Sequence, residues 1–448
     1  MKDAPPNLLR PQFPVPALPR EGPAQRLVGL YPQRQPGRFM QRVKAPGGRL
    51  TAEQWRTLGR LALGQAGGLL HLTTRQALEL HGLTAETVPL VQRELSAVGL
   101  TTVGACGDTL RNIVVCHGAG FCPGTVDVLP LAAALRQTLE THPQLYSLPR
   151  KFKISLSGCA EACAKPWLSD LGFVAVGRGR LQVIVAGSLG AKPELGIQFH
   201  EALPAEEAVA LALGAVDLFA AEGDRENRRR ARLRHVRQRL GDDEFRRQLD
   251  ERFRKRLAAG APRGSADLPA AGSGPPGVRL QFPLGDITAD QAESLADLAK
   301  QPAAALCLDT EHGLWLYGGA AEKLPAGLAG LVGGPRVVSC PGADYCASAI
   351  AYSRRTAAAI ADGLRGRAWP DAAVCVSGCP NGCAHSAVAP VGLLPRLRQE
   401  AGRQVEFYQL FSGGQGGRGP RLAAPAGDPI PAAEVPAAVA ALLGTLQL

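Results

Sequence analysis

The feature that most constrains the fold of this 448-residue chain is an internal repeat. Gly48-Arg-Leu-Thr-Ala-Glu-Gln54 recurs as Gly285-Asp-Ile-Thr-Ala-Asp-Gln291, and the segment 70–82 recurs at 306–318 with leucine, threonine and glycine in matching slots. The cysteines repeat too, as a pair separated by five residues followed by a Ser-Gly-Cys loop whose second cysteine comes three residues later. The first quartet is Cys116, Cys122, Cys159 and Cys163, and the second quartet is Cys340, Cys346, Cys379 and Cys383. Because the matched segments keep one order at spacings of 220 to 237 residues, we predict a tandem duplication of a unit of roughly 200 residues.

Each unit shows both strand and helix patterns. Leucines alternate with other residues over 70–72 and 78–80, which is typical of strands. The segment 51–63 is predicted to be a helix that begins with a capping box, Thr51-Ala-Glu-Gln54. The segment 151–156 alternates and runs directly into the first Ser-Gly-Cys loop, so we expect the cysteines on a loop at a strand end. The expected fold class is α+β, with two copies related by a pseudo-two-fold axis.

Arginine is concentrated in the segment that joins the two units. Gly223 to Leu257 includes the run Arg228-Arg-Arg-Ala-Arg-Leu-Arg234, and no aromatic residue for base stacking interleaves it before Phe245. We therefore interpret it as a solvated linking helix and not as a nucleic-acid site. Ala258 to Gly277 is rich in Gly, Pro and Ser and is predicted to be a flexible linker.

The composition places the chain among globular proteins with a negatively charged partner. The net charge is +11 and the sequence pI is about 9.3, which favours an acidic protein or anionic ligands. The Pro-rich N-terminus does not resemble a signal peptide, and no stretch of about 18 apolar residues follows. We expect a cytoplasmic protein without a membrane partner. Eleven cysteines in such a chain indicate metal binding more than a disulfide framework.

The two quartets offer sulfur ligands, which select zinc or an iron–sulfur cluster. Structural zinc sites use short knuckles of two to four residues. A gap of five residues between cysteines spans a cubane cluster, which is wider than a single metal ion, so the spacing favours an iron–sulfur cluster. Zinc remains the alternative at this point.

From Arg38 to Gly444 the chain resembles the siroheme-containing sulfite and nitrite reductase family. The most specific motif is Ser377-Gly-Cys-Pro-Asn-Gly-Cys383 with the cysteine pair before it. The resemblance implies that Cys340, Cys346, Cys379 and Cys383 hold a 4Fe–4S cluster. It also implies that Cys383 bridges to the siroheme iron, with Asn381 beside the cofactors.

Further segments resemble the anion and macrocycle sites of that family. Arg38-Phe-Met-Gln-Arg42 places Arg42 in the first substrate-arginine slot, and Leu110-Arg111-Asn112 supplies Arg111. Leu148-Pro-Arg-Lys-Phe-Lys153 is similar to a strand with two lysines, so Lys151 and Lys153 are expected to face one pocket.

The segment 72–81 resembles the part of the family that binds the carboxylates of the macrocycle. The resemblance gives that role to Arg75 and His81, while Glu79 stands in a slot that usually holds glutamine.

The resemblance implies six domains in chain order. They are a Pro-rich arm (1–37), a first ferredoxin-like half domain (38–103), a first cluster-type domain (104–222), the basic helix and flexible linker (223–277), a second half domain (278–334) and a 4Fe–4S and siroheme domain (335–448).

The two units differ in their cations. At a spacing of 220 residues, Asp371 and Ala373 replace Lys151 and Lys153, although Arg279 occupies the slot of Arg42. We therefore expect one complete site, with anion residues from the first unit and siroheme held by the second. The exact repeat of the cysteine spacing also predicts a second 4Fe–4S cluster on the first quartet.

The implied function is the six-electron reduction of sulfite to sulfide, slightly preferred, or of nitrite to ammonia. No Gly-x-Gly-x-x-Gly fingerprint leads from a strand pattern into a helix pattern, so electrons are expected from ferredoxin or a separate reductase subunit. A precorrin-3B synthase-like monooxygenase is the main alternative, and it would not need the four cations. A zinc or nucleic-acid-binding protein is the second alternative.

Overall fold

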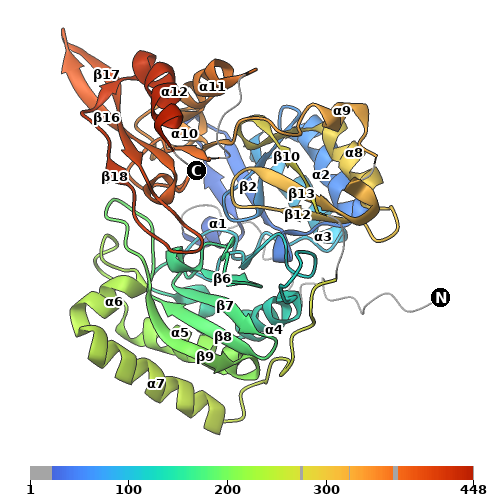
Figure 1. Ribbon diagram of the computed structural model, residues 1–448, viewed down its shortest axis with the longest axis vertical. Helices are drawn as coiled ribbons and strands as arrows, with labels where there is room; N and C mark the ends of the chain where they lie inside the picture. The colour runs from blue at the N-terminus through green and yellow to red at the C-terminus, as the bar shows by residue number, and fades with distance from the viewer. Residues whose placement is uncertain (1–22, 273–275, 322, 367–371, 447–448) are drawn as a thin grey trace.

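The computed structural model describes residues 23–272, 276–321, 323–366 and 372–446. The larger part of the arm expected over 1–37, residues 1–22, lies outside the described residues. The rest forms three lobes (Figure 1): one in blue and yellow built from the N-terminal parts of both units, a green one from the first unit, and an orange-red one from the second. Within the described ranges, no helix is long and apolar enough to cross a membrane.

The blue and yellow lobe, here called the shared lobe, joins the two units through one sheet and one core. Its larger sheet has the order β1-β2-β4-β3-β11, with bounds Leu30–Pro32, Phe39–Lys44, Ala77–Leu83, Leu69–Leu72 and Asp286–Thr288. The smaller sheet has the order β10-β13-β12, with bounds Val278–Gln281, Gly313–Tyr317 and Ala305–Leu308. Strand β11 of the second unit pairs antiparallel with β3 of the first. A single core contains Trp55 and Leu70 as well as Phe282 and Leu314.

The helices of the shared lobe also pack across the two units. They are α1 (Pro23–Leu27), α2 (Ala52–Gln65), α3 (Val88–Ala97), α8 (Ala289–Leu298) and α9 (Ala326–Ala329). Helix α2 is the predicted helix, and its capping box is present: Gln54 N donates to Thr51 Oγ1 at 3.2 Å and Thr51 N to Gln54 Oε1 at 3.0 Å. A Cβ at Gly59 would come within 2.9 Å of Ala292, so this glycine allows α2 and α8 to approach closely.

The green lobe, here called the first α/β lobe, is a five-stranded sheet covered by helices. Its strands β5 to β9 are Val114–Val115, Ile154–Ser157, Leu171–Gly177, Arg180–Val185 and Ile197–Pro204, in that order across the sheet. The first three are parallel. Its helices are α4 (Leu129–Glu140), α5 (Ala208–Glu222), α6 (Leu233–Leu240) and α7 (Asp242–Ala258).

The orange-red lobe, here called the second α/β lobe, repeats this plan. Strands β14 (Val337–Ser339), β15 (Val374–Val376) and β16 (Val391–Glu400) are parallel, and β17 (Arg403–Ser412) returns antiparallel. The short strands β18 (Ala424–Pro425) and β19 (Ile430–Pro431) pair with β17. Helices α10 (Gly342–Tyr345), α11 (Ser353–Leu364) and α12 (Val435–Thr445) complete the lobe. The α+β fold class is confirmed.

The basic segment differs from the solvated helix that we expected. It forms α6 and α7, and α7 buries Phe245, Leu249 and Phe253 in the core of the first α/β lobe. The following segment is also not a free linker: Leu268 is buried, and Ala270 forms a bridge with Val126. The apolar face of α7 is not apparent from the sequence, because its three buried side chains recur only every four residues among twelve polar or charged residues.

Candidate functional site

The cysteine loops lie where parallel strands end. Cys116 follows β5 and Cys159 follows β6, while Cys340 and Cys379 follow β14 and β15 closely. Neighbouring parallel strands end at one edge of a sheet, so each quartet is brought together there. The two lobes repeat a contact in detail: the amide of Gly158 donates to Cys116 Sγ and the amide of Gly378 to Cys340 Sγ, both at 3.1 Å.

The donor chemistry of the quartets suits an iron–sulfur cluster. All eight cysteines are free thiols. In the part of the chain that the structure describes, no three His, Cys, Asp or Glu side chains converge closely enough to hold one metal ion. Four thiols on two loops at one sheet edge provide the sulfur ligands that a 4Fe–4S cluster requires.

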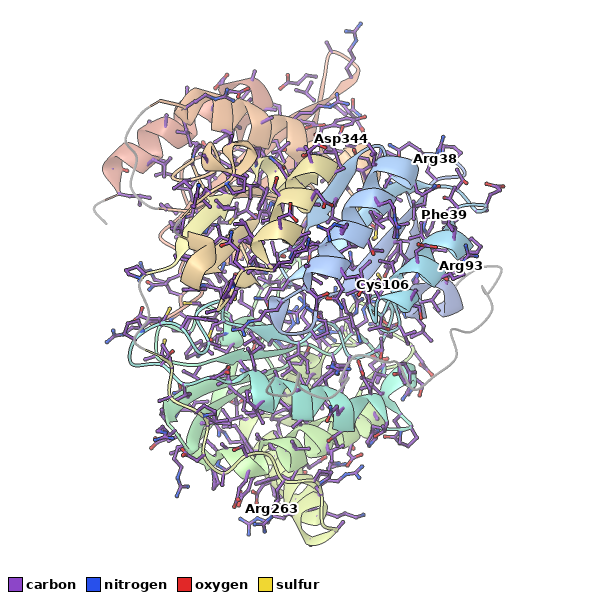
Figure 2. The ribbon with its side chains drawn as sticks, turned by 90° about the vertical axis from the view of Figure 1, so that its right-hand side faces the viewer. Arg38, Phe39, Arg93, Cys106, Arg263 and Asp344 are labelled. Carbon is purple, nitrogen blue, oxygen red and sulfur yellow. The ribbon has the colours of Figure 1, made fainter. Side chains whose placement is uncertain are left out.

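Two of the predicted anion residues are already paired within the protein. On β2, Arg42 donates to Glu79 Oε1 from Nε at 2.8 Å and from Nη2 at 2.6 Å, and its Nη1 lies 3.2 Å from Cys106 Sγ. Burial alone would lower the pKa of Arg42, but Cys106 and Glu79 raise it above its ordinary value. Arg111 donates to the carbonyls of Ala105 and Gly107. It therefore braces the loop that carries Cys106, at the boundary between the shared and first α/β lobes (Figure 2).

The other two anion residues carry unpaired ammonium groups. Lys151 and Lys153 flank the buried Phe152, and Lys153 lines a pocket described below. Within the described residues, neither ammonium makes a hydrogen bond or an ion pair. Burial, with Arg232 and Arg111 nearby, lowers the pKa of Lys151 to about 7. Burial, with Arg75 and Lys151 nearby, lowers the pKa of Lys153 well below its ordinary value.

The strand that we expected over 151–156 begins later than predicted. β6 starts at Ile154, and Phe152 makes only an isolated bridge with Leu110. The amide of Lys153 donates to Asp170 Oδ2 at 2.9 Å. Asp170 also accepts Arg232 Nη2 at 2.8 Å, and both side chains are buried. The basic segment thus supplies a residue that positions Lys153.

The second quartet reaches this cation site through Cys383. Thr74 Oγ1 of the first unit donates to the carbonyl of Cys383 at 2.8 Å. Lys151 lies within electrostatic reach of the Cys383 thiol, and Cys383 and Cys346 are exposed. One site therefore combines cations of the first unit with a cysteine loop of the second.

The residues expected to bind the macrocycle border the same region. Arg75 Nη2 donates to the carbonyl of Asn112 at 2.8 Å, while its buried Nε has no partner within the described residues. His81 Nε2 lies 3.0 Å from Glu79 Oε2, and its ring lies 4.6 Å from that of Tyr345. Burial would raise the pKa of Glu79, but Arg42 and His81 hold it well below its usual range. Glu79 is thus a carboxylate that pairs with two site residues.

Asn381 lies on the loop of the second quartet, apart from the cation cluster. It is exposed and stands two residues after Cys379.

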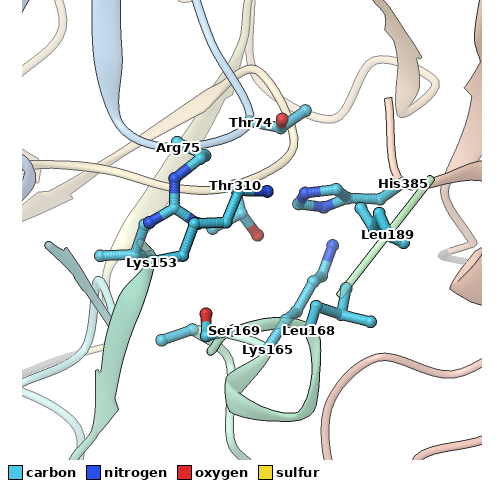
Figure 3. Close-up of a pocket in the computed structure, with 11 residues that line it drawn as sticks. Thr74, Arg75, Lys153, Lys165, Leu168, Ser169, Leu189, Thr310 and His385 are labelled. Carbon is cyan, nitrogen blue, oxygen red and sulfur yellow. The ribbon is translucent and has the colours of Figure 1, made fainter. Parts of the chain in front are cut away.

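A small pocket lies between the two units, next to Lys153 (Figure 3). Its lining includes matched pairs from the two copies: Thr74 with Thr310, and Lys165 with His385. Lys165 Nζ pairs with Glu311 at 2.7 Å, and His385 is 6% exposed with no partner for Nδ1 within the described residues. The matched lining indicates that the pocket lies on the pseudo-two-fold axis.

The sequence did not point to three of these residues. Cys106 stands outside both quartets, Asp170 is a single acidic residue in an apolar stretch, and Arg232 is one of many arginines. Their roles arise from contacts between segments 62 to 64 residues apart. Asp170 carried the only usable signal, because a lone carboxylate between apolar residues requires a buried partner.

Comparison with known proteins gives the same assignment over most of the chain. The protein-family model described as nitrite and sulphite reductase 4Fe-4S domain matches residues 106–257. The family model described as nitrite/sulfite reductase ferredoxin-like half domain matches residues 31–98. The ferredoxin–nitrite reductase of Synechococcus elongatus is 30% identical over 85% of this chain and 81% of its own length. Sulfite reductase (ferredoxin) 1 of Mycolicibacterium paratuberculosis is 28% identical over 88% of this chain and 79% of its own length.

A solved structure shows the same fold. The NirA protein of Mycobacterium tuberculosis superposes with a TM-score of 0.80 at 24% identity, over 93% of this chain and 85% of its own. The repeated cysteine loops, the shared lobe and a 30% identical relative aligned along most of both chains have one explanation: this protein is an oxidoreductase of the nitrite/sulfite reductase family, with ferredoxin-like half domains and a 4Fe–4S domain.

Proposed function

We propose that the chain carries out the six-electron reduction of a small oxyanion, sulfite to sulfide, which is slightly preferred, or nitrite to ammonia. The observation that carries this proposal is the pair of unpaired ammonium groups, Lys151 and Lys153, beside the loop that holds Cys383. Unpaired cations in a partly buried site are costly unless an anion joins them. The proposed anion is the substrate, with Arg42 and Arg111 as fixed positive charges behind the lysines.

We further propose that Cys340, Cys346, Cys379 and Cys383 hold a 4Fe–4S cluster and that Cys383 also faces siroheme. Siroheme, when bound, supplies the iron that takes the central atom of the oxyanion and passes electrons to it. Its eight carboxylates need cationic partners, and Arg75, with an unpartnered buried Nε, fits that need. His81 borders the same space. The Cys383 thiol is exposed, so it would be accessible to siroheme.

The lysines act on the substrate oxygens. A unit charge at about 4 Å and an effective dielectric constant near 20 contributes on the order of 4 kcal/mol. Two such charges stabilise negative charge that develops on the departing oxygens. With a pKa of about 7, Lys151 both holds and releases a proton near neutral pH, as a general acid must. Lys153, fixed through Asp170 and Arg232, orients the oxyanion.

Ferredoxin is the proposed electron donor. The two relatives described above are named as ferredoxin-dependent reductases of nitrite and of sulfite. The net charge of +11 favours docking of an acidic electron carrier. Among the described residues, no Gly-x-Gly-x-x-Gly segment leads from a strand into a helix, which agrees with an external donor.

Turnover with reduced methyl viologen tests the function directly. Purified protein with a siroheme absorbance spectrum should consume sulfite and release sulfide, and it should reduce nitrite more slowly. Faster turnover of nitrite would reverse the order of the two substrates. A protein that binds siroheme but reduces neither anion would contradict the proposal and leave the precorrin-3B synthase-like reaction, which acts on a tetrapyrrole.

A further inference from the structure

The first quartet has no part in the proposed reaction, yet the structure repeats the backbone of the second quartet around it. Equivalent amides donate to equivalent carbonyls in both loops. In the first unit, the amides of Cys116, Cys122 and Ala162 donate to the carbonyls of Leu156 (2.9 Å), Gly118 (2.9 Å) and Cys159 (3.1 Å). In the second unit, the amides of Cys340, Cys346 and Gly382 donate to the carbonyls of Val376 (3.3 Å), Gly342 (2.8 Å) and Cys379 (3.3 Å). The sulfurs of both quartets are therefore presented by one backbone geometry.

At one position the two loops differ in sequence where the backbone has a positive φ, which is unfavourable for a residue other than glycine. Gly382 of the second loop has φ 64°, and the matching Ala162 has φ 52°. Alanine disfavours this left-handed conformation because its Cβ crowds the backbone. The loop nevertheless keeps this conformation, and the Ala162 amide donates to the Cys159 carbonyl. The absence of glycine has not altered the ligand loop.

The space above the first quartet is filled by aromatic rings. At the repeat spacing of 236 residues, Trp315 and Tyr317 replace Glu79 and His81. The ring of Trp315 stacks on His117 at 4.3 Å, and Tyr317 stacks on Phe121 at 4.6 Å. The Tyr317 hydroxyl lies 2.9 Å from His117 Nδ1 and 3.8 Å from Cys122 Sγ. A large macrocycle has no room where these four rings pack.

The cations for a macrocycle or an oxyanion are also missing on this side. Glu311 takes the place of Arg75 and is paired with Lys165 at 2.7 Å and with Arg336 at 3.2 Å. Arg279, in the slot of Arg42, is paired with Asp309 at 2.8 Å. Ala373 stands in the slot of Lys153; Asp371, in the slot of Lys151, lies outside the described residues.

We infer that the first quartet holds a second 4Fe–4S cluster that has no siroheme beside it. Four free thiols on a loop geometry that matches the second quartet provide the ligand set. The aromatic packing and the loss of cations exclude the macrocycle. The inference does not depend on which oxyanion the enzyme reduces, because it concerns a site that the substrate does not reach.

Iron content of the intact enzyme, purified without oxygen, tests this inference. Two clusters and one siroheme give about nine irons per chain, whereas one cluster and one siroheme give about five. Siroheme is counted separately from its absorbance after extraction. About nine irons with one siroheme is the expected result. About five irons with one siroheme in the wild-type protein would overturn the inference, as would zinc in place of the missing iron.

A pair of variants assigns the extra iron to the first quartet. The variant Cys159→Ala/Cys163→Ala should lose about four irons and one EPR signal of the dithionite-reduced protein, while siroheme absorbance stays at one per chain. The control Cys375→Ala removes a buried thiol outside both quartets and should keep the wild-type iron content. Equal iron in the double variant and the wild type would contradict the inference. Failure of oxyanion turnover with nine irons present would instead count against the proposed function alone.

Discussion

At the residue scale, the site separates cations that have protein partners from cations that do not. Arg42 and Arg111 are held by Glu79 and by loop carbonyls, so their positions are fixed before any ligand arrives. Lys151 and Lys153 have no such partner among the described residues. In the proposed reaction, the fixed charges set the field of the site, and the two lysines are the groups that move toward the anion and exchange protons with it.

The variant Lys153→Met should lower turnover of sulfite and nitrite by at least about 100-fold, as expected when a donor to the transition state is lost. Siroheme and cluster spectra should stay unchanged, since Lys153 is not one of the proposed cluster ligands. The control Lys300→Met removes an exposed lysine paired with Asp297 and should keep normal turnover. Near-normal turnover in Lys153→Met would remove this lysine from the mechanism.

Lys151 should make the stability of the siroheme-free protein depend on pH. Its pKa is about 7 in the folded state, against an ordinary value of 10.5, so the unfolded chain binds more protons between these values. Stability must then rise with pH in this window. Urea unfolding between pH 7 and pH 8, below the ordinary thiol pKa of 9.0, should show this rise in the wild type relative to Lys151→Met. In Lys151→Met the slope should be smaller, and an unchanged slope would show that Lys151 does not titrate there.

At the element scale, the basic segment 223–258 shows what sequence patterns can and cannot reveal. Repeats, capping boxes and cysteine spacing are local patterns, so the α+β duplication and the loop positions of both quartets could be predicted. The burial of α6 and α7 depends on surfaces presented by the rest of the lobe. Nothing in the run of arginines marks Arg232 as the one that reaches Asp170, because that choice is made by packing between distant elements.

The pair of Arg232 and Asp170 should therefore matter more than the exposed charges of α7. Arg232→Met leaves a fully buried carboxylate without its partner and should lower the free energy of unfolding by about 3–5 kcal/mol. Arg247→Met, an exposed residue on α7 paired with Glu244, is the matched control and should change little. Denaturant unfolding measures both.

The double variant Asp170→Asn/Arg232→Met separates the pair from simple packing. Removing the buried charge together with its partner should recover part of the lost stability. Turnover should remain low in the double variant, because Asp170 also accepts the amide of Lys153. Recovery of full turnover would show that the pair does not position Lys153.

At the scale of the whole molecule, the shared lobe makes the two units inseparable. The edge of β3 is covered by β11 of the other unit, and Phe282 and Leu314 complete the core around Trp55. On the exposed face of the same packing, Arg56 of α2 pairs with Glu293 at 2.6 Å and Asp297 at 3.0 Å of α8.

Splitting the chain after Gly272 should give two halves that do not fold alone. Each half would expose an open sheet edge and part of an apolar core, and both features promote aggregation. Expressed together, the halves should assemble and bind siroheme, because the pairing of β3 with β11, the common core and the ion pairs between α2 and α8 do not need the covalent link. Size-exclusion chromatography and the siroheme spectrum of each sample provide the measurement. A soluble, monomeric second half would contradict the role given to the shared lobe.

The pairing of β11 with β3 also has a consequence for how the enzyme could arise. A chain of half this length could cover the same strand edge only by binding a second copy of itself, which gives a symmetric dimer with two identical centres. In such a dimer every substitution appears at both centres, so neither can change alone. Joining the copies in one gene removes that restraint. One centre could then exchange its lysines for alanine and its macrocycle space for stacked rings while the other stayed active.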